Sequence, residues 1–283
     1  MPEGDTVYKV AAAMRPLLVG QRLERARILT VVGSERLKGS LVTSLETRGK
    51  NFLFTLQGKR EMMLRVHLGM NGSWHRYAPE ESWKGSARDA RVQLSTPEHV
   101  FVCFTPKNAD LFEARELPIF LPIARLGPDL LGPEPALEVA GQRALSQPDR
   151  PLAEVLLDQR VAAGLGNVYK SELCFLGAYP NWALQGRFFE PHEGYNPWTP
   201  VGEIGPQAVL SLLARGRDAL LANLGGWERT TTFDRRREPQ RARPTHWVYE
   251  MGGRPCRVCR APIQRRVWGA EARVTYWCPG CQP

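Results

Sequence analysis

Four cysteines near the C-terminus constrain the fold more than any other feature of this 283-residue chain. They form two Cys-x2-Cys pairs, Cys256 with Cys259 and Cys278 with Cys281, with eighteen residues between the pairs. Each pair closes a tight knuckle, and two knuckles at this separation are typical of a tetrahedral Zn2+ site with four thiolate ligands. The sequence therefore predicts a C-terminal zinc finger whose intervening residues form a β-hairpin. Because four protein ligands leave no open position, we expect one structural zinc ion that is not the catalyst.

The charge of the chain favours a polyanionic partner. Lys and Arg outnumber Asp and Glu by 38 to 29, which gives a net charge of +9. This excess favours nucleic acid first and an anionic membrane surface second. No apolar run approaches the ~18 residues of a membrane span, and no charged-then-apolar leader opens the chain. We therefore expect an intracellular protein without disulfides, in which Cys103 and Cys174 are core thiols.

The N-terminus carries candidate catalytic groups. The chain begins Met1-Pro2-Glu3-Gly4, and an initiator Met before a small residue is usually removed, which would leave Pro2 with a free secondary amine. An α-amino group titrates near ~8, against ~10.4 for lysine, so more of it is available as a Schiff-base nucleophile at neutral pH. The carboxyl group of Glu3 stands directly beside it. Many chains begin Met-Pro without catalytic consequence, so this motif needs support from the rest of the sequence.

Local patterns divide the remainder of the chain. Apolar residues from Gly4 to Val19 have helical spacing, with Asp5 or Thr6 as the expected N-cap. Short strand-like runs with Gly and Pro turns follow as far as Leu111, which indicates a β-sandwich or barrel. A Pro- and Gly-rich stretch then reads as a linker, and beyond it the period becomes helical. We predict an α+β fold with a β-sandwich domain over 1–126, a linker over 127–140, a helical domain over 141–250 and the zinc finger over 251–283.

Several loops offer groups to a phosphate-rich partner. The turn Gly164-Leu165-Gly166 precedes Asn167, the expected cap of the next helix, so its backbone N–H groups could face a phosphate. Most such turns only satisfy backbone geometry. Arg48-Gly49-Lys50 is a basic turn, and Met70 lies in a glycine-bearing loop where it is either a core residue or an outward-pointing one. The arginine-rich stretch 229–243 is either a solvated basic loop or a mobile loop close to phosphate.

Together these motifs resemble the formamidopyrimidine-DNA glycosylase/endonuclease VIII family of base-excision repair enzymes. The resemblance spans the whole chain, and its four motifs occur in the family's order: Met1-Pro2-Glu3-Gly4, Glu46-Thr47-Arg48-Gly49-Lys50, Gly164-Leu165-Gly166-Asn167-Val168-Tyr169 and the paired cysteines. The first two look more like the endonuclease VIII branch, and His67-Leu68-Gly69-Met70 looks more like the formamidopyrimidine branch. The resemblance implies an N-terminal β-sandwich, a helix–two-turn–helix domain and a zinc finger.

The resemblance also implies roles for individual residues. Pro2 would attack C1′ of a damaged nucleotide flipped out of the duplex, and Glu3 would protonate the sugar ring oxygen as the base leaves. Lys50 and Arg273 would clamp the flanking phosphates and assist β- and δ-elimination. The remaining implied or expected DNA contacts are the wedge residue Met70, the backbone amides at Gly164 and Gly166 together with Asn167, and Arg265 and Arg266 of the hairpin.

The expected activity is that of a bifunctional DNA glycosylase/AP lyase. Its partner would be double-stranded DNA with a damaged base or abasic site, met by a monomer in the bacterial cytoplasm at the nucleoid. Oxidised pyrimidines are the expected lesions; the alternatives are an 8-oxoguanine- or formamidopyrimidine-preferring glycosylase and a non-catalytic binder of damaged DNA. The formamidopyrimidine branch fills the gap in the DNA helix with an Arg and a Phe of one loop, and in the corresponding stretch Phe104–Asp110 neither is in place. Thr6 stands where both branches commonly have a Glu. These departures leave the choice of lesion open.

Overall fold

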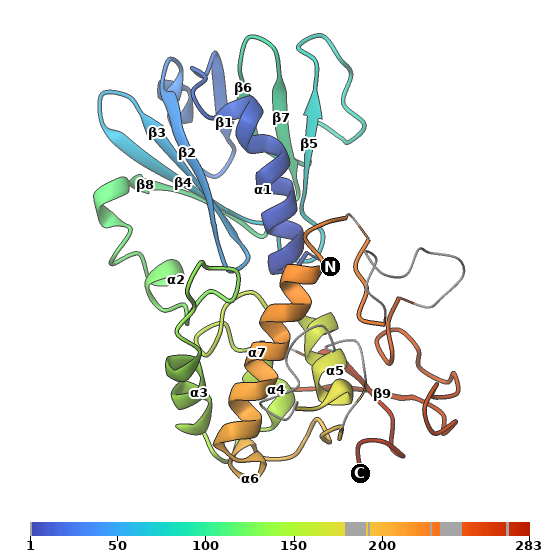
Figure 1. The fold of residues 1–283 in the computed structure, drawn as a ribbon. Coiled ribbons are helices and arrows are strands. Elements are labelled where there is room, and N and C mark those ends of the chain that lie inside the picture. Colours follow the sequence, from blue (N-terminus) through green and yellow to red (C-terminus); the bar gives the residue numbers. More distant parts are fainter. Residues whose placement is uncertain (1, 179–190, 192, 227, 233–244, 270–271) are drawn as a thin grey trace. The chain divides into compact units, whose positions relative to one another are not determined.

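A computed structural model describes the chain except residues 1, 179–190, 192, 227, 233–244 and 270–271. The chain divides into two compact units, residues 1–125 (unit 1) and 126–283 (unit 2), which are treated separately below (Figure 1). Among the described helices, none combines the length and the apolar character that a membrane crossing requires. The arginine-rich stretch lies mostly outside the described residues, so its predicted proximity to phosphate stays a prediction.

Unit 1 is a β-sandwich with a helix, α1, at its N-terminus (Figure 1). One antiparallel sheet has the strand order β2-β3-β4-β8 and the other β1-β6-β7-β5. The strands are β1 Arg25–Ile28, β2 Leu41–Arg48, β3 Asn51–Gln57, β4 Glu61–His67, β5 Ser73–Tyr77, β6 Ala90–Ser95, β7 Val100–Phe104 and β8 Asn108–Glu113. Alternating apolar residues from both sheets and α1 form one core, for example Val7, Phe54 and Leu94, each fully buried. The predicted sandwich is confirmed.

Helix α1, Gly4–Leu18, begins two residues earlier than an N-cap at Asp5 would allow and three earlier than one at Thr6. Its N-cap is Glu3, so the prediction of Asp5 or Thr6 as N-cap is wrong. Asp5 lies inside the first turn, fully buried, with its carboxylate 3.5 Å from Nζ of Lys9. An acidic group in the first turn also complements the partial positive charge of the helix N-terminus. Burial of this pair within the unit therefore fixes where the helix starts.

Unit 2 is helical and ends in a hairpin. Its helices are α3 Leu137–Leu145, α4 Leu152–Leu157, α5 Asn167–Leu176, α6 Val201–Ile204 and α7 Pro206–Ala222; short helices η1 Ser34–Leu37, η2 Ala114–Glu116 and α2 Leu121–Ala124 belong to unit 1. All ten residues of α5 are buried, and the helix forms the centre of the unit 2 core. The stretch 127–140 is packed into this core through Leu130, which is fully buried, and it includes the start of α3.

The C-terminal hairpin consists of β9, Gln264–Trp268, and β10, Arg273–Trp277, paired antiparallel as predicted. The chain leading to it is fastened to α5 by the buried carboxylate of Glu172. This group accepts backbone N–H bonds from Trp247, Val248 and Tyr249 at 2.8–2.9 Å. A buried charge is tolerated when hydrogen bonds replace its hydration, and here they tie the entry of the finger to the central helix.

Candidate functional site

The N-terminal end of α1 presents two adjacent groups of different exposure. Pro2 is partly exposed, whereas Glu3 is fully buried. As N-cap, Glu3 has an extended backbone, and its carbonyl oxygen accepts the first helical hydrogen bond from Val7 N at 3.0 Å. The backbone of Glu3 is therefore fixed by the helix start, and its buried side chain follows directly on the partly exposed residue 2.

Lys50 lies at a defined end of the β2-β3-β4-β8 sheet. It is in the β2–β3 turn, and the register pairs Asn51 at the start of β3 with His67 at the end of β4. A buried arginine secures this turn, because Arg65 Nε donates to Asn51 Oδ1 at 2.8 Å while its Nη1 reaches Asp110 Oδ2 at 2.6 Å. These hydrogen bonds therefore hold the basic turn identified in the sequence at this end of the sheet.

His67 is a neutral structural group at the same end of the sheet. Burial, together with the positive charges of Arg65, Lys50 and Lys107, lowers the pKa of His67 to about 4. Its Nδ1 accepts a hydrogen bond from the backbone N–H of Gly69 at 3.2 Å. An uncharged imidazole therefore holds the start of the loop that follows β4 across the physiological pH range.

That loop exposes Met70, whose side chain is 61% accessible. The turn closes through a hydrogen bond from Gly72 N to the carbonyl oxygen of Leu68 at 3.1 Å. Gly69 has φ +68°, and a Cβ there would lie 2.8 Å from Cβ of Lys107, so glycine is required. Of the two interpretations of Met70, the structure supports an outward-pointing side chain.

In unit 2 the glycine turn is used mainly to join elements. The N–H of Gly164 donates to Oε1 of Gln159 at 3.1 Å, so this amide already has an acceptor inside the protein. Gly166, which is buried, is the N-cap of α5, so the prediction that Asn167 caps the helix is wrong. Asn167 is instead the first helical residue, and its Nδ2 donates to the carbonyl oxygen of Val274 on β10 at 2.8 Å. The turn thereby places the hairpin against α5.

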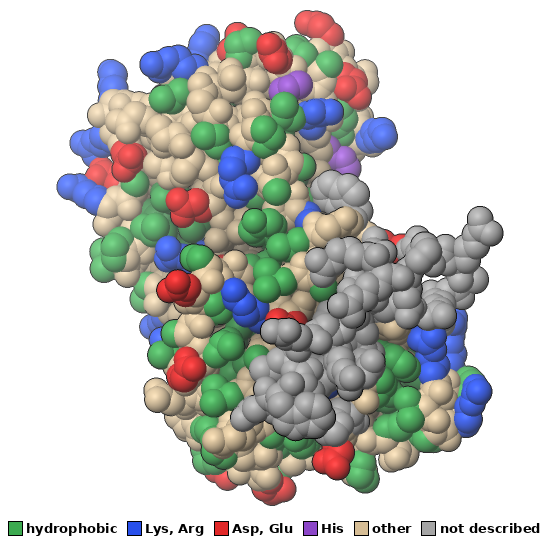
Figure 2. Space-filling model, in the orientation of Figure 1, with side chains coloured by type: hydrophobic (Ala, Val, Ile, Leu, Met, Phe, Trp, Pro, Cys, Tyr) green, Lys and Arg blue, Asp and Glu red, His purple; other side chains and the backbone are tan. Residues whose placement is uncertain are grey.

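The hairpin carries the three arginines singled out in the sequence. Arg273 is partly exposed and pairs with Trp268 across the hairpin. Arg266 lies with its guanidinium 4.5 Å from the ring centroid of Trp268 and 5.9 Å from that of Trp198, so cation–π contacts brace it. Arg265, next to it on β9, is exposed. On the face shown in Figure 2, basic side chains are scattered among acidic ones.

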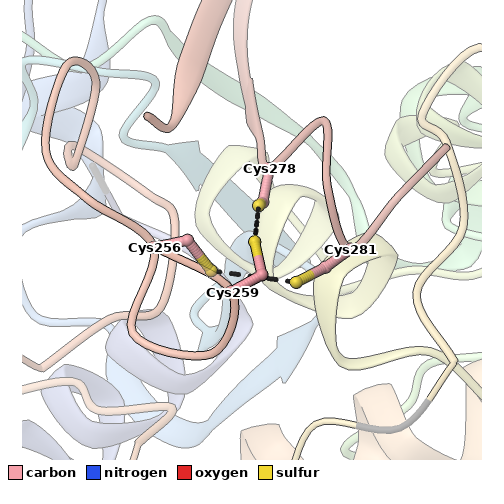
Figure 3. Close-up of side chains that lie close together, drawn as sticks. All are labelled: Cys256, Cys259, Cys278 and Cys281. Atoms are coloured by element: carbon pink, nitrogen blue, oxygen red, sulfur yellow. Dashed lines mark hydrogen bonds between the residues drawn. The ribbon is translucent and has the colours of Figure 1, made fainter. Parts of the chain in front are cut away.

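The four C-terminal cysteines converge as a metal site requires (Figure 3). Their sulfur atoms all lie within 4.8 Å of one another, with 3.8 Å between Cys256 and Cys281 and 3.3 Å between Cys259 and Cys278. A tetrahedral Zn2+ with ~2.3 Å bonds would separate its sulfurs by ~3.8 Å, whereas a disulfide needs about 2.05 Å. The donors therefore fit one structural Zn2+. The two other cysteines, both free, are fully buried core thiols as expected, and burial raises the pKa of Cys174 to about 12.

Comparison with known proteins identifies the family. The profile of the formamidopyrimidine-DNA glycosylase N-terminal domain matches residues 1–108. The chain is 38% identical to the DNA-(apurinic or apyrimidinic site) lyase Nei2 of Mycolicibacterium smegmatis, with coverage of 100% of this chain and 99% of the relative. The chain belongs to the formamidopyrimidine-DNA glycosylase/endonuclease VIII (Fpg/Nei) family. A probable endonuclease 8 2 of Streptomyces coelicolor is 36% identical over 100% of this chain and 94% of the relative.

Solved structures agree with this assignment to the Fpg/Nei family. The MutM (Fpg) protein of Thermus thermophilus superposes with a TM-score of 0.75 at 27% identity, covering 99% of this chain and 98% of the other. A MutM bound to DNA containing carbocyclic 8-oxo-G gives a TM-score of 0.77 at 18% identity, which shows a shared fold. The predicted fold class, enzyme class and structural zinc are confirmed, and the chain is an Fpg/Nei-family DNA glycosylase/AP lyase of base-excision repair.

Several residues that shape this Fpg/Nei site escaped the sequence analysis. Arg65, Lys170 and Glu172 are buried charged residues that hold the Lys50 turn, the hairpin and the chain leading to the finger. The available signal was their type, because Lys170 and Glu172 are the two charged residues of a helix whose last four residues are all apolar. Charged residues in a fully buried helix need internal partners, but the sequence alone does not say which.

Loss of a zinc ligand is expected to disable the finger of this Fpg/Nei protein. In a Cys278→Ser variant one thiolate is missing, so the binding free energy that orders the finger is largely lost. We expect zinc content near zero and DNA affinity lower by at least about tenfold, because Arg273, five residues upstream, is no longer held. Metal analysis and a binding titration check this; Cys103→Ser, outside the cluster, is the control. Full affinity in the zinc-free variant would contradict it.

Proposed function

We propose that this enzyme removes oxidised bases, pyrimidines foremost, from double-stranded DNA through a Schiff base on Pro2 and then nicks the strand by β,δ-elimination. The observation that carries the proposal is the arrangement at the start of α1, where a fully buried Glu3 directly follows the accessible residue 2. A nucleophile and a fixed acid side by side are what this reaction needs.

In the first half of the reaction, the nitrogen of Pro2 replaces the damaged base at C1′ of the sugar. The lone pair of the Pro2 nitrogen attacks C1′ of the flipped-out nucleotide, and the bond between C1′ and the base breaks. The electron pair of that bond leaves with the base, which takes up the proton that the Pro2 nitrogen loses. Glu3 gives a proton to the ring oxygen as the sugar opens, and Pro2 remains joined to C1′ as an iminium ion. Because Pro2 is a secondary amine, this iminium is a permanent cation and a strong electron sink.

The second half cuts the strand. The iminium acidifies the C2′ proton, and Glu3, now a carboxylate, is the proposed acceptor. The electron pair left on C2′ expels the phosphate on the 3′ side; a second elimination, from C4′, expels the phosphate on the 5′ side, and water releases Pro2. Lys50 would stabilise the charge that develops on a departing phosphate.

The proposed DNA footprint extends over both units. In unit 1, the exposed Met70 is suited to fill the space left by the flipped nucleotide. In unit 2, Asn167 and Arg273 lie on elements joined by a hydrogen bond and are proposed to hold the backbone, as is the exposed Arg265. The turn at Gly164–Gly166 is proposed to join them, with the N–H of Gly164 exchanging its Gln159 acceptor for a phosphate oxygen. Arg266 is proposed to contribute charge while braced on its tryptophans. The net charge of +9 supports binding to DNA, and we propose that the enzyme works as a monomer on the bacterial chromosome.

The preference for pyrimidines rests on the endonuclease VIII character of the N-terminal motifs. Relatives named endonuclease 8 2 or Nei2 are 34–38% identical, whereas a formamidopyrimidine-DNA glycosylase of Thermus thermophilus is 29% identical. A panel of single-lesion duplexes separates the two branches. Faster excision of an oxidised pyrimidine than of 8-oxoguanine supports the preference, and the reverse order overturns it.

Borohydride trapping tests the chemistry. The trimmed enzyme is incubated with duplex DNA containing one abasic site and sodium borohydride, which reduces an iminium to a stable amine. We expect a covalent protein–DNA adduct, and peptide mass spectrometry should place it on residue 2. Binding of the abasic duplex without adduct or nick would overturn the proposal and select the non-catalytic binder. An adduct on a lysine would overturn the role of Pro2.

A further inference from the structure

A lysine stands at the contact between the central helix of unit 2 and the hairpin. The side chain of Lys170, on α5, is fully buried. Its Nζ donates to Thr275 Oγ1 at 2.7 Å, to Asn167 Oδ1 at 2.8 Å and to the carbonyl oxygen of Val274 at 3.1 Å. An ammonium group has three N–H donors, and these three acceptors match them.

These contacts join two elements that are distant in sequence. Two of the acceptors belong to the residues that follow Arg273 on β10, about a hundred positions from the lysine. The third belongs to Asn167, which itself donates to Val274. Lys170 therefore sits between the two residues of unit 2 proposed to hold backbone phosphate.

The hairpin has little other burial at this point. Every residue of β9 is exposed, and Thr275 is the one fully buried residue of β10. Two of the zinc ligands, Cys256 and Cys259, precede β9 and the other two, Cys278 and Cys281, follow β10, so the metal site holds the base of the hairpin. Lys170 holds the part that carries Arg273, and both side chains line the same small cavity of ≈120 Å³.

Burying an ammonium group is costly unless its hydrogen bonds are all replaced. An apolar residue would fill a buried helix position without that cost. We propose that Lys170 is a positioning residue that locks Arg273 and Asn167 into one phosphate-binding unit. This inference rests on the proposed function, in which those two residues contact the DNA backbone.

A double-mutant cycle on binding tests it without requiring any chemistry. The probe is a duplex with a tetrahydrofuran abasic analogue, titrated at several salt concentrations with wild type, Lys170→Met, Arg273→Ala and the double variant. We expect Lys170→Met to weaken binding about tenfold and to make the slope of log K against log salt shallower by about one, as loss of one phosphate contact does. On the Arg273→Ala background the same change should weaken binding less than about twofold, because the lysine acts through that arginine.

Two further variants separate positioning from folding. Thr275→Val removes one acceptor of Lys170 at nearly constant volume. It should weaken binding about threefold and make the salt slope shallower, as Lys170→Met does. Ser171→Ala is the matched control, since among the described residues its buried Oγ donates within α5, to Asn167 O at 3.1 Å; it should leave the salt slope unchanged. Zinc content should stay at wild-type level in all of these variants.

The outcomes are distinct. An unchanged salt slope in both Lys170→Met and Thr275→Val overturns the inference, and so does full additivity with Arg273→Ala. If Lys170→Met loses zinc or unfolds, the Thr275→Val result alone decides. A wild-type enzyme that forms no borohydride adduct overturns the proposed function but leaves the binding cycle readable, so the two failures can be told apart.

Discussion

An enzyme that keeps Met1 is expected to form no borohydride adduct with abasic-site DNA and to leave the strand intact. In that form the nitrogen of Pro2 is part of an amide bond, whose lone pair is delocalised and unavailable for attack on C1′. We expect a loss of at least about 10³-fold in single-turnover rate, or ~4 kcal/mol of barrier. Partial exposure of residue 2 makes the site accessible to the trimming enzyme as well as to DNA.

This form also provides its own rescue. Protein produced with methionine aminopeptidase inhibited retains Met1, and later treatment with that aminopeptidase should restore the adduct in proportion to the trimmed fraction measured by intact mass. Affinity for the tetrahydrofuran duplex should be far less affected, because the phosphate contacts remain. Equal adduct yield before and after trimming would mean that another amine is the nucleophile.

Glu3→Gln is expected to separate the two halves of the reaction. Glutamine has nearly the same shape but cannot donate the proton that the ring oxygen needs as the base leaves. Base excision should fall by about 10²–10⁴-fold, the usual contribution of a general acid. Nicking at a preformed abasic site should fall by a smaller factor, since no base has to be expelled and the iminium already acidifies the C2′ proton.

The measurement compares single-turnover rates on a duplex with one oxidised pyrimidine and on the matching abasic duplex. Asp5→Asn is the control, because Asp5 is equally buried in the first turn of the same helix and pairs with Lys9. If disturbance of the helix start were the cause, both variants would lose excision. Equal losses on both substrates for Glu3→Gln would argue against its role as the acid.

Signals that are local in sequence predicted most of the fold correctly. Cysteine spacing identified the finger, and period-two apolar runs identified the sandwich, because each follows from geometry within a few residues. The start of α1 was misplaced because the cap depends on burial of Glu3 and Asp5, which is a tertiary effect. The partner of Asn167 could not be foreseen either, since Val274 lies 107 residues away in the chain.

The site shows the same division. Pro2, Lys50 and the cysteines belong to short motifs that can be recognised without knowing the fold, although their catalytic and DNA-binding roles stay proposals. The supporting charges do not belong to such motifs. The roles of Arg65 and Lys170 depend on hydrogen-bond acceptors in other elements of the fold, so these roles can be recognised only in the folded structure. Met70 was ambiguous for a related reason, because exposure of a loop residue depends on what covers it.

Helix α5 has a consequence for how the protein is made. Glu172 accepts hydrogen bonds from the segment that leads into the finger, and Lys170, two residues before it, donates to strand β10 of the hairpin. The hydrogen-bond donors to Glu172 and the acceptors of Lys170 on β10 lie some 75 to 105 residues further along the chain, so they leave the ribosome after the helix itself. Because burying either charge without its partners is costly, we expect the helical core to complete its packing only once these segments are present. Completion of unit 2 is thereby coupled to the arrival of the last segment, and a chain truncated before β10 would leave Lys170 without the acceptors on that strand.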